Sequence, residues 1–122
     1  MLPEHFNDDE KLYRAVLPLS YFWEEDGNGE LRLSSAALRD SNGLSVDRGY
    51  YRSDSEVKDS MRQRLKGQII SFEVQDCRSV QAHVLYKPSS NRYHSEVHGG
   101  EDKVILSNFQ RKKLAEKAKV LK

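Results

Sequence analysis

Residues 53–75, SDSEVKDSMRQRLKGQIISFEVQ, hold the pattern that decides the fold class. Ser53 and Glu56 match a capping box, in which each side chain bonds to the other residue's backbone N–H and starts a helix. Gly67 stands just past the expected helix end, and residues 70–75 then alternate apolar with polar side chains, as a strand does. Three apolar residues at four-residue spacing give the helix one apolar stripe: Val57, Met61 and Leu65. A helix that leads directly into a strand indicates a mixed domain.

The neighbouring segments extend this pattern in both directions. Residues 80–86 alternate again after a four-residue link, which predicts an antiparallel hairpin with 70–75. Residues 93–98 predict a third strand, and residues 11–17 a further strand that Pro18 ends. A second capping box opens a helix over 107–121, whose apolar face is formed by Leu114, Ala118 and Leu121. We therefore expect an α+β fold, a mostly antiparallel sheet with two principal helices packed on one face.

Length and composition bound the class of protein. The chain has 122 residues, of which 37% are hydrophobic and 32% charged, which suits a single domain over residues 11–122. Residues 1–10 contain few apolar side chains, and we expect them to be disordered. No apolar run approaches the roughly 20 residues of a membrane span, and the N-terminus lacks a signal-peptide pattern. One cysteine, Cys77, excludes an intramolecular disulfide and suits a reducing compartment, so we expect a cytoplasmic protein. Because there is no membrane-spanning run, we also expect no membrane contact.

Charge is distributed unevenly along the chain. Residues 111–122 carry a charge of +5, and because the whole chain carries +1, the remainder carries −4. A basic helix on an acidic body can bind nucleic acid or an acidic protein surface, although cations also suit a helix C-terminus without any partner. The residues predicted to make such contacts are Arg111, Lys112, Lys113, Lys117 and Lys119.

The densest group of polar residues lies in the third predicted strand. Alternation places His94, Glu96 and His98 on one face, where Glu96 can orient a histidine that moves a proton near neutral pH. An arginine, either Arg14, Arg48 or Arg92, can stabilise a phosphate or an oxyanion beside them, and Arg14 is the one predicted to be catalytic. His94 and His98 begin about 13 Å apart on a strand, too far for one metal ion held by all three side chains unless the strand bends at Gly99-Gly100. Two neighbours with His83 or His5 are the other way to hold a metal, but we predict no metal, and we predict no cofactor. The alternative is a solvated polar strand face.

Two further groups are candidates. Ser34, Ser35 and Arg48, with nearby turn residues, can form a phosphate cradle, although capping and turn chemistry explains the serines equally well. Cys77 lies beside Arg78, which can lower a thiol pKa, but no histidine adjoins it in sequence.

Three blocks of sequence resemble a set of small bacterial proteins that contain the same blocks in the same order. The blocks are Ser34-Ser35-Ala36-Ala37-Leu38, Leu44-Ser45-Val46-Asp47 and Tyr93-His94-Ser95-Glu96-Val97-His98-Gly99. The resemblance covers most of the chain and implies an independent bacterial domain. Small domains of this kind often act in conflict or toxin-type systems, and we expect the same setting here.

A looser similarity connects the chain with the ADP-ribosyltransferases. Arg14, Ser35 and Glu96 follow the order of the arginine, serine and glutamate of that family. The resemblance implies that Arg14 and Ser35 bind NAD and that Glu96 polarises the ribose. The chain departs from the family pattern because it is short, lacks the usual threonine after the serine, and has His94 where a second acid would stand.

The sequence thus supports two functional hypotheses. The first is a binding or accessory protein that engages nucleic acid or a protein partner through the basic helix. The alternative is a small nucleotide- or RNA-directed enzyme, either a metal-independent nuclease or ADP-ribosyltransferase-like, that uses His94, Glu96 and His98 with an arginine.

Overall fold

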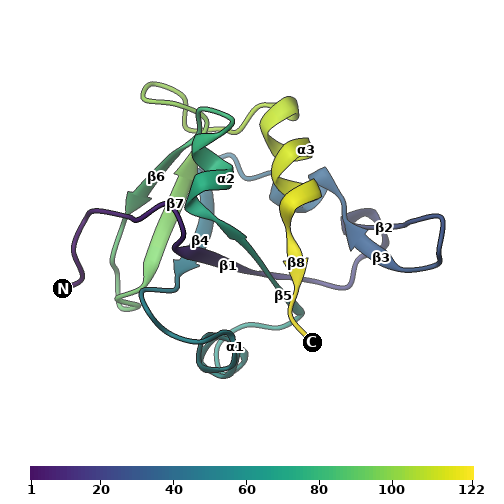
Figure 1. The fold of residues 1–122 in the computed structure, drawn as a ribbon, viewed down its shortest axis with the longest axis horizontal. Helices are drawn as coiled ribbons and strands as arrows, with labels where there is room; N and C mark the ends of the chain where they lie inside the picture. Colours follow the sequence, from purple (N-terminus) through teal and green to yellow (C-terminus); the bar gives the residue numbers. More distant parts are fainter.

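A computed structural model describes all residues 1–122, and its central element is a six-stranded antiparallel sheet (Figure 1). The spatial order of the strands is β6-β7-β4-β1-β5-β8, and a separate two-stranded sheet pairs β2 with β3. The strands are β1 (Lys11–Val16), β2 (Trp23–Glu25), β3 (Leu31–Leu33), β4 (Leu44–Arg48), β5 (Gln68–Glu73), β6 (His83–Tyr86), β7 (His94–His98) and β8 (Lys119–Val120). The helices are α1 (Asp54–Arg62), α2 (Val74–Arg78) and α3 (Asn108–Lys117), with short 3₁₀ turns η1 (Ser20–Phe22) and η2 (Ser35–Leu38). The α+β class expected from the sequence is confirmed.

The principal helices lie on opposite faces of the sheet, so the expectation that both pack on one face is wrong. The larger core lies between the sheet and α3 and includes Leu12, Ile70 and Leu114. A smaller core on the other face joins Tyr13 and Ile69 to the apolar stripe of α1 and to Leu121. Adjacent strand residues point to opposite faces, and both members of the pairs 12–13 and 69–70 are buried. The centre of the sheet is therefore covered on both sides, with α3 above it and α1 below it in Figure 1.

Helix α1 begins as predicted and ends earlier than its apolar pattern suggests. Ser53 and Glu56 form the reciprocal capping box, and Val57 and Met61 are buried. The helix ends at Arg62, and Leu65 is 42% exposed. Gly67 adopts a φ of +107°, and a Cβ there would overlap the backbone of β1, so the connection to β5 requires glycine. As a result, α1 covers only part of its face of the sheet.

The predicted hairpin between residues 70–75 and 80–86 does not form. Asp76 accepts a hydrogen bond from the backbone N–H of Glu73 (2.9 Å), and this capping interaction starts α2 at the end of β5. Val74 and Cys77, three residues apart, are buried on one side of α2. Strand β6 then pairs with β7 at the sheet edge rather than with β5.

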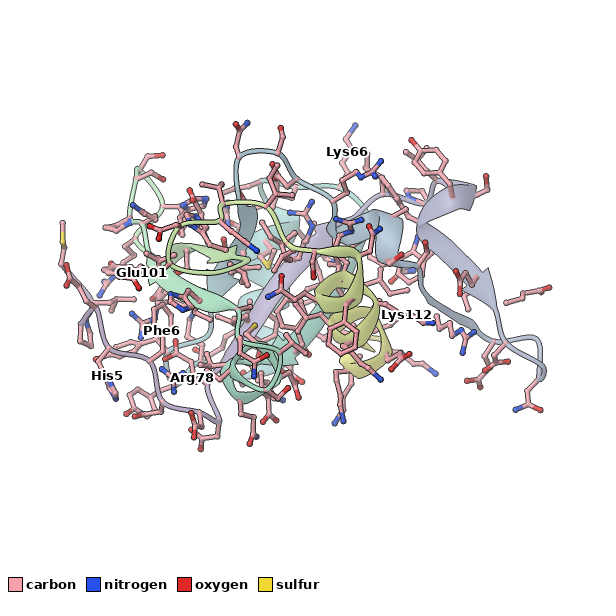
Figure 2. The ribbon with its side chains drawn as sticks, turned by 90° about the horizontal axis from the view of Figure 1, so that it is seen from above. His5, Phe6, Lys66, Arg78, Glu101 and Lys112 are labelled. Atoms are coloured by element: carbon pink, nitrogen blue, oxygen red, sulfur yellow. The ribbon has the colours of Figure 1, made fainter.

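Residues 1–10 are packed against the sheet, contrary to the disorder expected for them. Leu2 and Phe6 are 6% and 2% exposed. The fully buried guanidinium of Arg48 donates hydrogen bonds to both carboxylate oxygens of Glu10 (2.7 and 2.9 Å) and to the carbonyl of His5 (2.9 Å). Figure 2 shows His5, Phe6 and Arg78 at one end of the molecule, where Arg78 also bonds to the carbonyl of Phe6 (3.0 Å). Composition indicated disorder because the charge that holds this segment lies far away in the sequence.

The C-terminal segment is not one continuous helix over 107–121. Helix α3 ends at Lys117, Ala118 has an extended conformation, and β8 pairs with β5. The extended turn carries Leu121 to the smaller core, on the face opposite to Leu114. None of the three α-helices has the combination of length and apolar character needed to cross a membrane.

Candidate functional site

One half of a sheet face is not covered by a helix. Helix α1 packs over Tyr13 and Ile69, whereas β4, β7 and β6 present polar side chains beside it. Strand register places Ser45 opposite Glu96, Asp47 opposite His94, and His83 opposite His98 on this face. The prediction that His94, Glu96 and His98 share a face is confirmed, because the intervening Ser95 and Val97 are both fully buried.

Glu96 and His98 form a close pair on this face. The Nε2 atom of His98 lies 2.8 Å from Oε1 of Glu96, and the side chains are 16% and 22% exposed. Gly43 lies beside them with a φ of +92°, and a Cβ there would lie 2.8 Å from His98 Nε2. Glycine at position 43 thus leaves the space that the pair occupies, and a carboxylate so placed fixes the orientation of the imidazole.

His94 is oriented differently and stands apart from that pair. Its Nδ1 lies 2.8 Å from the carbonyl oxygen of Lys87, and its Nε2 lies 3.4 Å from the hydroxyl of Ser45. A carbonyl oxygen can only accept a hydrogen bond, so Nδ1 carries the hydrogen and Nε2 of the neutral ring is the acceptor. The ring nitrogen that can take up a proton therefore faces Ser45.

Arg14 fills a gap between two strands. Strands β1 and β4 pair only at Leu12–Arg48 and Tyr13–Asp47, and beyond this point they separate. Arg14 Nη1 donates to the carbonyl of Ser45 (2.9 Å) and its Nε to the carbonyl of Ala37 (3.3 Å), which leaves Nη2 without a protein partner. Burial lowers the pKa of Arg14 and the Asp40 carboxylate opposes the shift, but an arginine remains a cation throughout the physiological range.

Arg14, Ser45 and His94 line one cleft of about 500 Å³, which is called the His94 cleft below. Arg64 and Lys66, from the chain that follows α1, supply two more cations, and both are exposed. The further lining residues that carry polar side chains are Tyr13, Asp47, Ser89, Ser90 and Asn91. The only acid among them, Asp47, is already bonded to Arg64 (2.7 Å) and to the amide of Asn91 (2.9 Å). The cleft therefore has an excess of positive charge beside a histidine.

Sequence reasoning missed part of this cleft. Arg64 and Lys66 stand shortly before Gly67, at the expected helix end, and nothing in their spacing marks a site. Ser45 reaches the cleft through the register of β4 with β7, which depends on contacts between distant residues. The Glu96–His98 pair lies outside the cleft lining, so the three predicted residues separate into two groups.

The predicted phosphate cradle is not formed. Arg48 is fully buried with its hydrogen bonds made to residues of the N-terminal segment, so the prediction that it binds phosphate is wrong. The hydroxyl of Ser34 is only 3.2 Å from the backbone N of Ala36, where it caps η2, the turn that contains Ser35. A capping role, the alternative reading of the two serines, accounts for Ser34.

The five basic residues predicted to contact a partner do not form one surface. Arg111 is 8% exposed and donates to the carbonyl of Leu106 (2.8 Å) and to Asn108, so it supports the helix start rather than a partner. Lys119 lies in β8 on the α1 face, opposite Ser71. Helix α3 keeps three exposed lysines, namely Lys112, which Figure 2 labels on this helix, Lys113 and Lys117.

Cys77 is not a candidate nucleophile. It is fully buried in α2, and burial, with a further contribution from Asp76, raises the pKa of its thiol to about 12.

The structure contains no cluster of three or more histidine, cysteine or carboxylate side chains placed to hold a metal ion. No protein-family model, curated protein or solved structure gives a significant match to this chain. The candidate site is therefore defined by the convergence of β1, β4 and β7.

Proposed function

We propose that this chain is a small enzyme that acts on a nucleotide or RNA substrate, which it binds by phosphate in the His94 cleft. The observation that carries the proposal is the convergence of Arg14, Ser45 and His94, from three adjacent strands, on one cationic cleft. Histidine, hydroxyl and arginine side chains together suit proton transfer next to a phosphate.

Phosphate binding follows from the charges of the cleft. Arg14 presents Nη2 with no protein partner, and Lys66 makes no ion pair. Asp47, which would repel an anion, is neutralised by Arg64. An anionic group in the cleft thus meets cations and hydroxyls and no free carboxylate, the combination that phosphate esters require.

Proton transfer is assigned to His94. With Nδ1 held by the Lys87 carbonyl, Nε2 is free to accept a proton from a substrate hydroxyl. In RNA, the ribose 2′-oxygen attacks the adjacent phosphorus as His94 takes its proton, and the cations stabilise the charge that develops on the phosphate oxygens. The P–O5′ bond breaks, which leaves a 2′,3′-cyclic phosphate and a 5′-oxygen that takes a proton from water. This is the metal-independent nuclease version of the proposal.

The ADP-ribosyltransferase resemblance gives a second version of the same proposal. Arg14, Ser45 and Glu96 lie on adjacent strands, with Arg14 bonded to the Ser45 carbonyl and Glu96 opposite Ser45 in the register. Ser45 therefore suits the serine role better than Ser35, which lies in η2. In this version Arg14 and Ser45 bind NAD and Glu96 polarises the ribose.

The test combines ligand binding with two activity assays on the intact chain. NAD, AMP and a short single-stranded RNA are titrated by calorimetry, and RNA cleavage and nicotinamide release are then measured. His94→Asn should lower RNA cleavage by about 10²–10⁴-fold in the nuclease version, whereas Glu96→Gln should abolish nicotinamide release in the transferase version. Arg32→Ala, on the separate two-stranded sheet, removes an exposed cation from outside every candidate site; it is the matched control and should change neither activity. Absence of binding to all three ligands would refute the proposal.

A binding function through α3 is a second candidate, and one observation favours it. Phe109 is 61% exposed and lies 5.8 Å from the Nζ of Lys113, next to the other exposed lysines of the helix. Exposed aromatic and basic residues together are typical of surfaces that bind single-stranded nucleic acid, and an acidic protein surface fits the same charges. A Lys112→Glu, Lys117→Glu variant should then lose salt-sensitive binding of RNA, whereas Lys119→Glu, on the opposite face, should retain it.

The cellular setting is part of the proposal. A buried, unpaired cysteine suits a reducing cytoplasm. An enzyme that consumes a nucleotide or cleaves RNA also suits a bacterial conflict or toxin-type system, as expected from the resemblance to small bacterial proteins.

A further inference from the structure

A second cleft, of about 750 Å³, lies at the other end of α1. It is bounded by the N-terminal segment and by the loop of residues 49–53 that joins β4 to α1, and we name it the Tyr51 cleft. Tyr13, which is buried beneath α1, lines both this cleft and the His94 cleft, so the two lie on either side of that side chain. His5, labelled in Figure 2, belongs to the N-terminal wall.

The loop beside this cleft has an unusual backbone. Tyr50 and Tyr51 have φ values of +46° and +64°, a left-handed conformation that bulky residues rarely adopt. Arg52 holds the loop in place by donating to the carbonyls of Arg48 (2.8 Å) and Gly49 (3.1 Å) while its guanidinium stacks 3.4 Å above the ring of Tyr93. The surrounding structure thus imposes the strain rather than relieving it.

The consequence of this geometry is an exposed aromatic ring. Tyr51 is 85% exposed, the largest exposure of any aromatic side chain here, and its ring centroid lies 5.0 Å from that of Tyr50. A ring that contributes nothing to the core but is held in a fixed, strained position can stack against a planar ligand.

The six charged side chains that line the cleft, three acidic and three basic, sum to zero charge. Four of them form two ion pairs, whereas Arg52 bonds to backbone carbonyls and Asp9 makes no ion pair. Glu10 is bonded to Arg48, and Asp54 accepts hydrogen bonds from Lys11 (3.1 Å) and from the hydroxyl of Tyr13 (2.6 Å). The remaining lining includes neutral hydrogen-bonding side chains, among them Asn7, Ser53 and Ser55. Such a lining suits an uncharged planar group with polar edges, whereas the cationic lining of the His94 cleft suits a phosphate.

We infer that the Tyr51 cleft binds a nucleobase of a single-stranded nucleic acid, and that a phosphate of the same strand occupies the His94 cleft. The inference rests on the proposed function and specifies its substrate class. The clefts lie at opposite ends of α1, which has nine residues and is roughly 13 Å long, and the base and phosphate of one mononucleotide are too close together to reach both. Tyr51 stacks on the base and acts in binding rather than in the reaction.

The test compares a mononucleotide with a short single-stranded RNA of the same base. AMP and a four-adenosine RNA are titrated by calorimetry into the wild type, Tyr51→Phe and Tyr51→Ala. Loss of one base–aromatic stack should weaken RNA binding by about 5- to 150-fold in Tyr51→Ala. Tyr51→Phe should bind the RNA as tightly as the wild type does, and all three proteins should bind AMP with the same affinity. Tyr21→Ala removes a comparably exposed ring from η1 and is the matched control.

Backbone strain is separated from stacking by a further variant. Tyr51→Gly relieves the left-handed strain and should raise the melting temperature while losing the same RNA affinity as Tyr51→Ala. If both variants bind the RNA as the wild type does, or if the RNA binds no more tightly than AMP, this inference is overturned and the proposed function stands. If neither AMP nor the RNA binds the wild type, both are overturned.

Discussion

Substitution of Arg48 by methionine is expected to destabilise the fold without acting on a ligand site. Arg48 is fully buried and forms two hydrogen bonds to Glu10, whose side chain is itself only 8% exposed. Its guanidinium carbon lies 4.0 Å from the centroid of the Phe6 ring, and further bonds reach the carbonyls of Pro3 and His5. Arg48 thus contacts the N-terminal segment at four residues, Pro3, His5, Phe6 and Glu10.

The size of the effect follows from the buried ion pair. Removing one partner leaves the Glu10 carboxylate buried without a cation, which costs about 3–5 kcal/mol. For a domain of 122 residues, the entropy of unfolding is about 0.26 kcal/mol/K at the melting temperature. Arg48→Met should therefore lower the melting temperature by about 12–20 °C.

Scanning calorimetry of three variants tests this reasoning. Glu10→Gln combined with Arg48→Met should recover part of the loss, because no buried charge remains unpaired. Arg78→Met removes an arginine that is 47% exposed and also bonds to the N-terminal segment, and it should cost no more than about 1 kcal/mol. A melting temperature of Arg48→Met within about 3 °C of the wild type would refute the structural role. A loss of nucleotide binding at unchanged stability would instead restore the phosphate-binding role predicted from the sequence.

Three more predictions follow from buried or constrained groups. Cys77, with a thiol pKa raised to about 12 by burial, should resist a thiol reagent at pH 8 in the folded protein and react readily in urea. Burial, with the hydrogen bond to Asp54, raises the pKa of Tyr13 above its unfolded value of about 10. Its contribution to the free energy of unfolding is therefore fully present below pH 10 and declines as the pH rises above it. Urea unfolding from about pH 9 to 11 should show a smaller decline in stability for Tyr13→Phe than for the wild type. Gly67→Ala should cost more than about 1 kcal/mol in the same assay, because φ is +107° and the new Cβ meets the Val16 carbonyl; an unchanged midpoint would contradict that geometry.

Local signals in the sequence predicted the elements whose causes are local. Both serine capping boxes, at Ser53 and Ser107, start helices as expected, because the bonds that cap a helix lie within three residues. The alternation that places His94, Glu96 and His98 on one face is likewise a property of a single strand.

Features that depend on distant residues could not be predicted in this way. The burial of the N-terminal segment depends on Arg48, some 40 positions away in sequence, whose charge gave no sign that it lies in the core. The helix predicted over 107–121 fails because Leu121 is buried against α1 instead of extending the apolar face of α3. The cationic cleft was missed for the same reason, since Arg64 meets Asp47 only through the packing of α1 on the sheet.

The early end of α1 is what leaves a site available on this sheet. The helix has nine residues, and the chain then turns so that Arg64 reaches Asp47 on β4. The segment between Arg62 and Gly67 contributes Arg64 and Lys66 to the edge of the uncovered face, beside His94. The glycine that ends the connection thus fixes both the return of the chain into β5 and the position of the cations that we assign to phosphate binding.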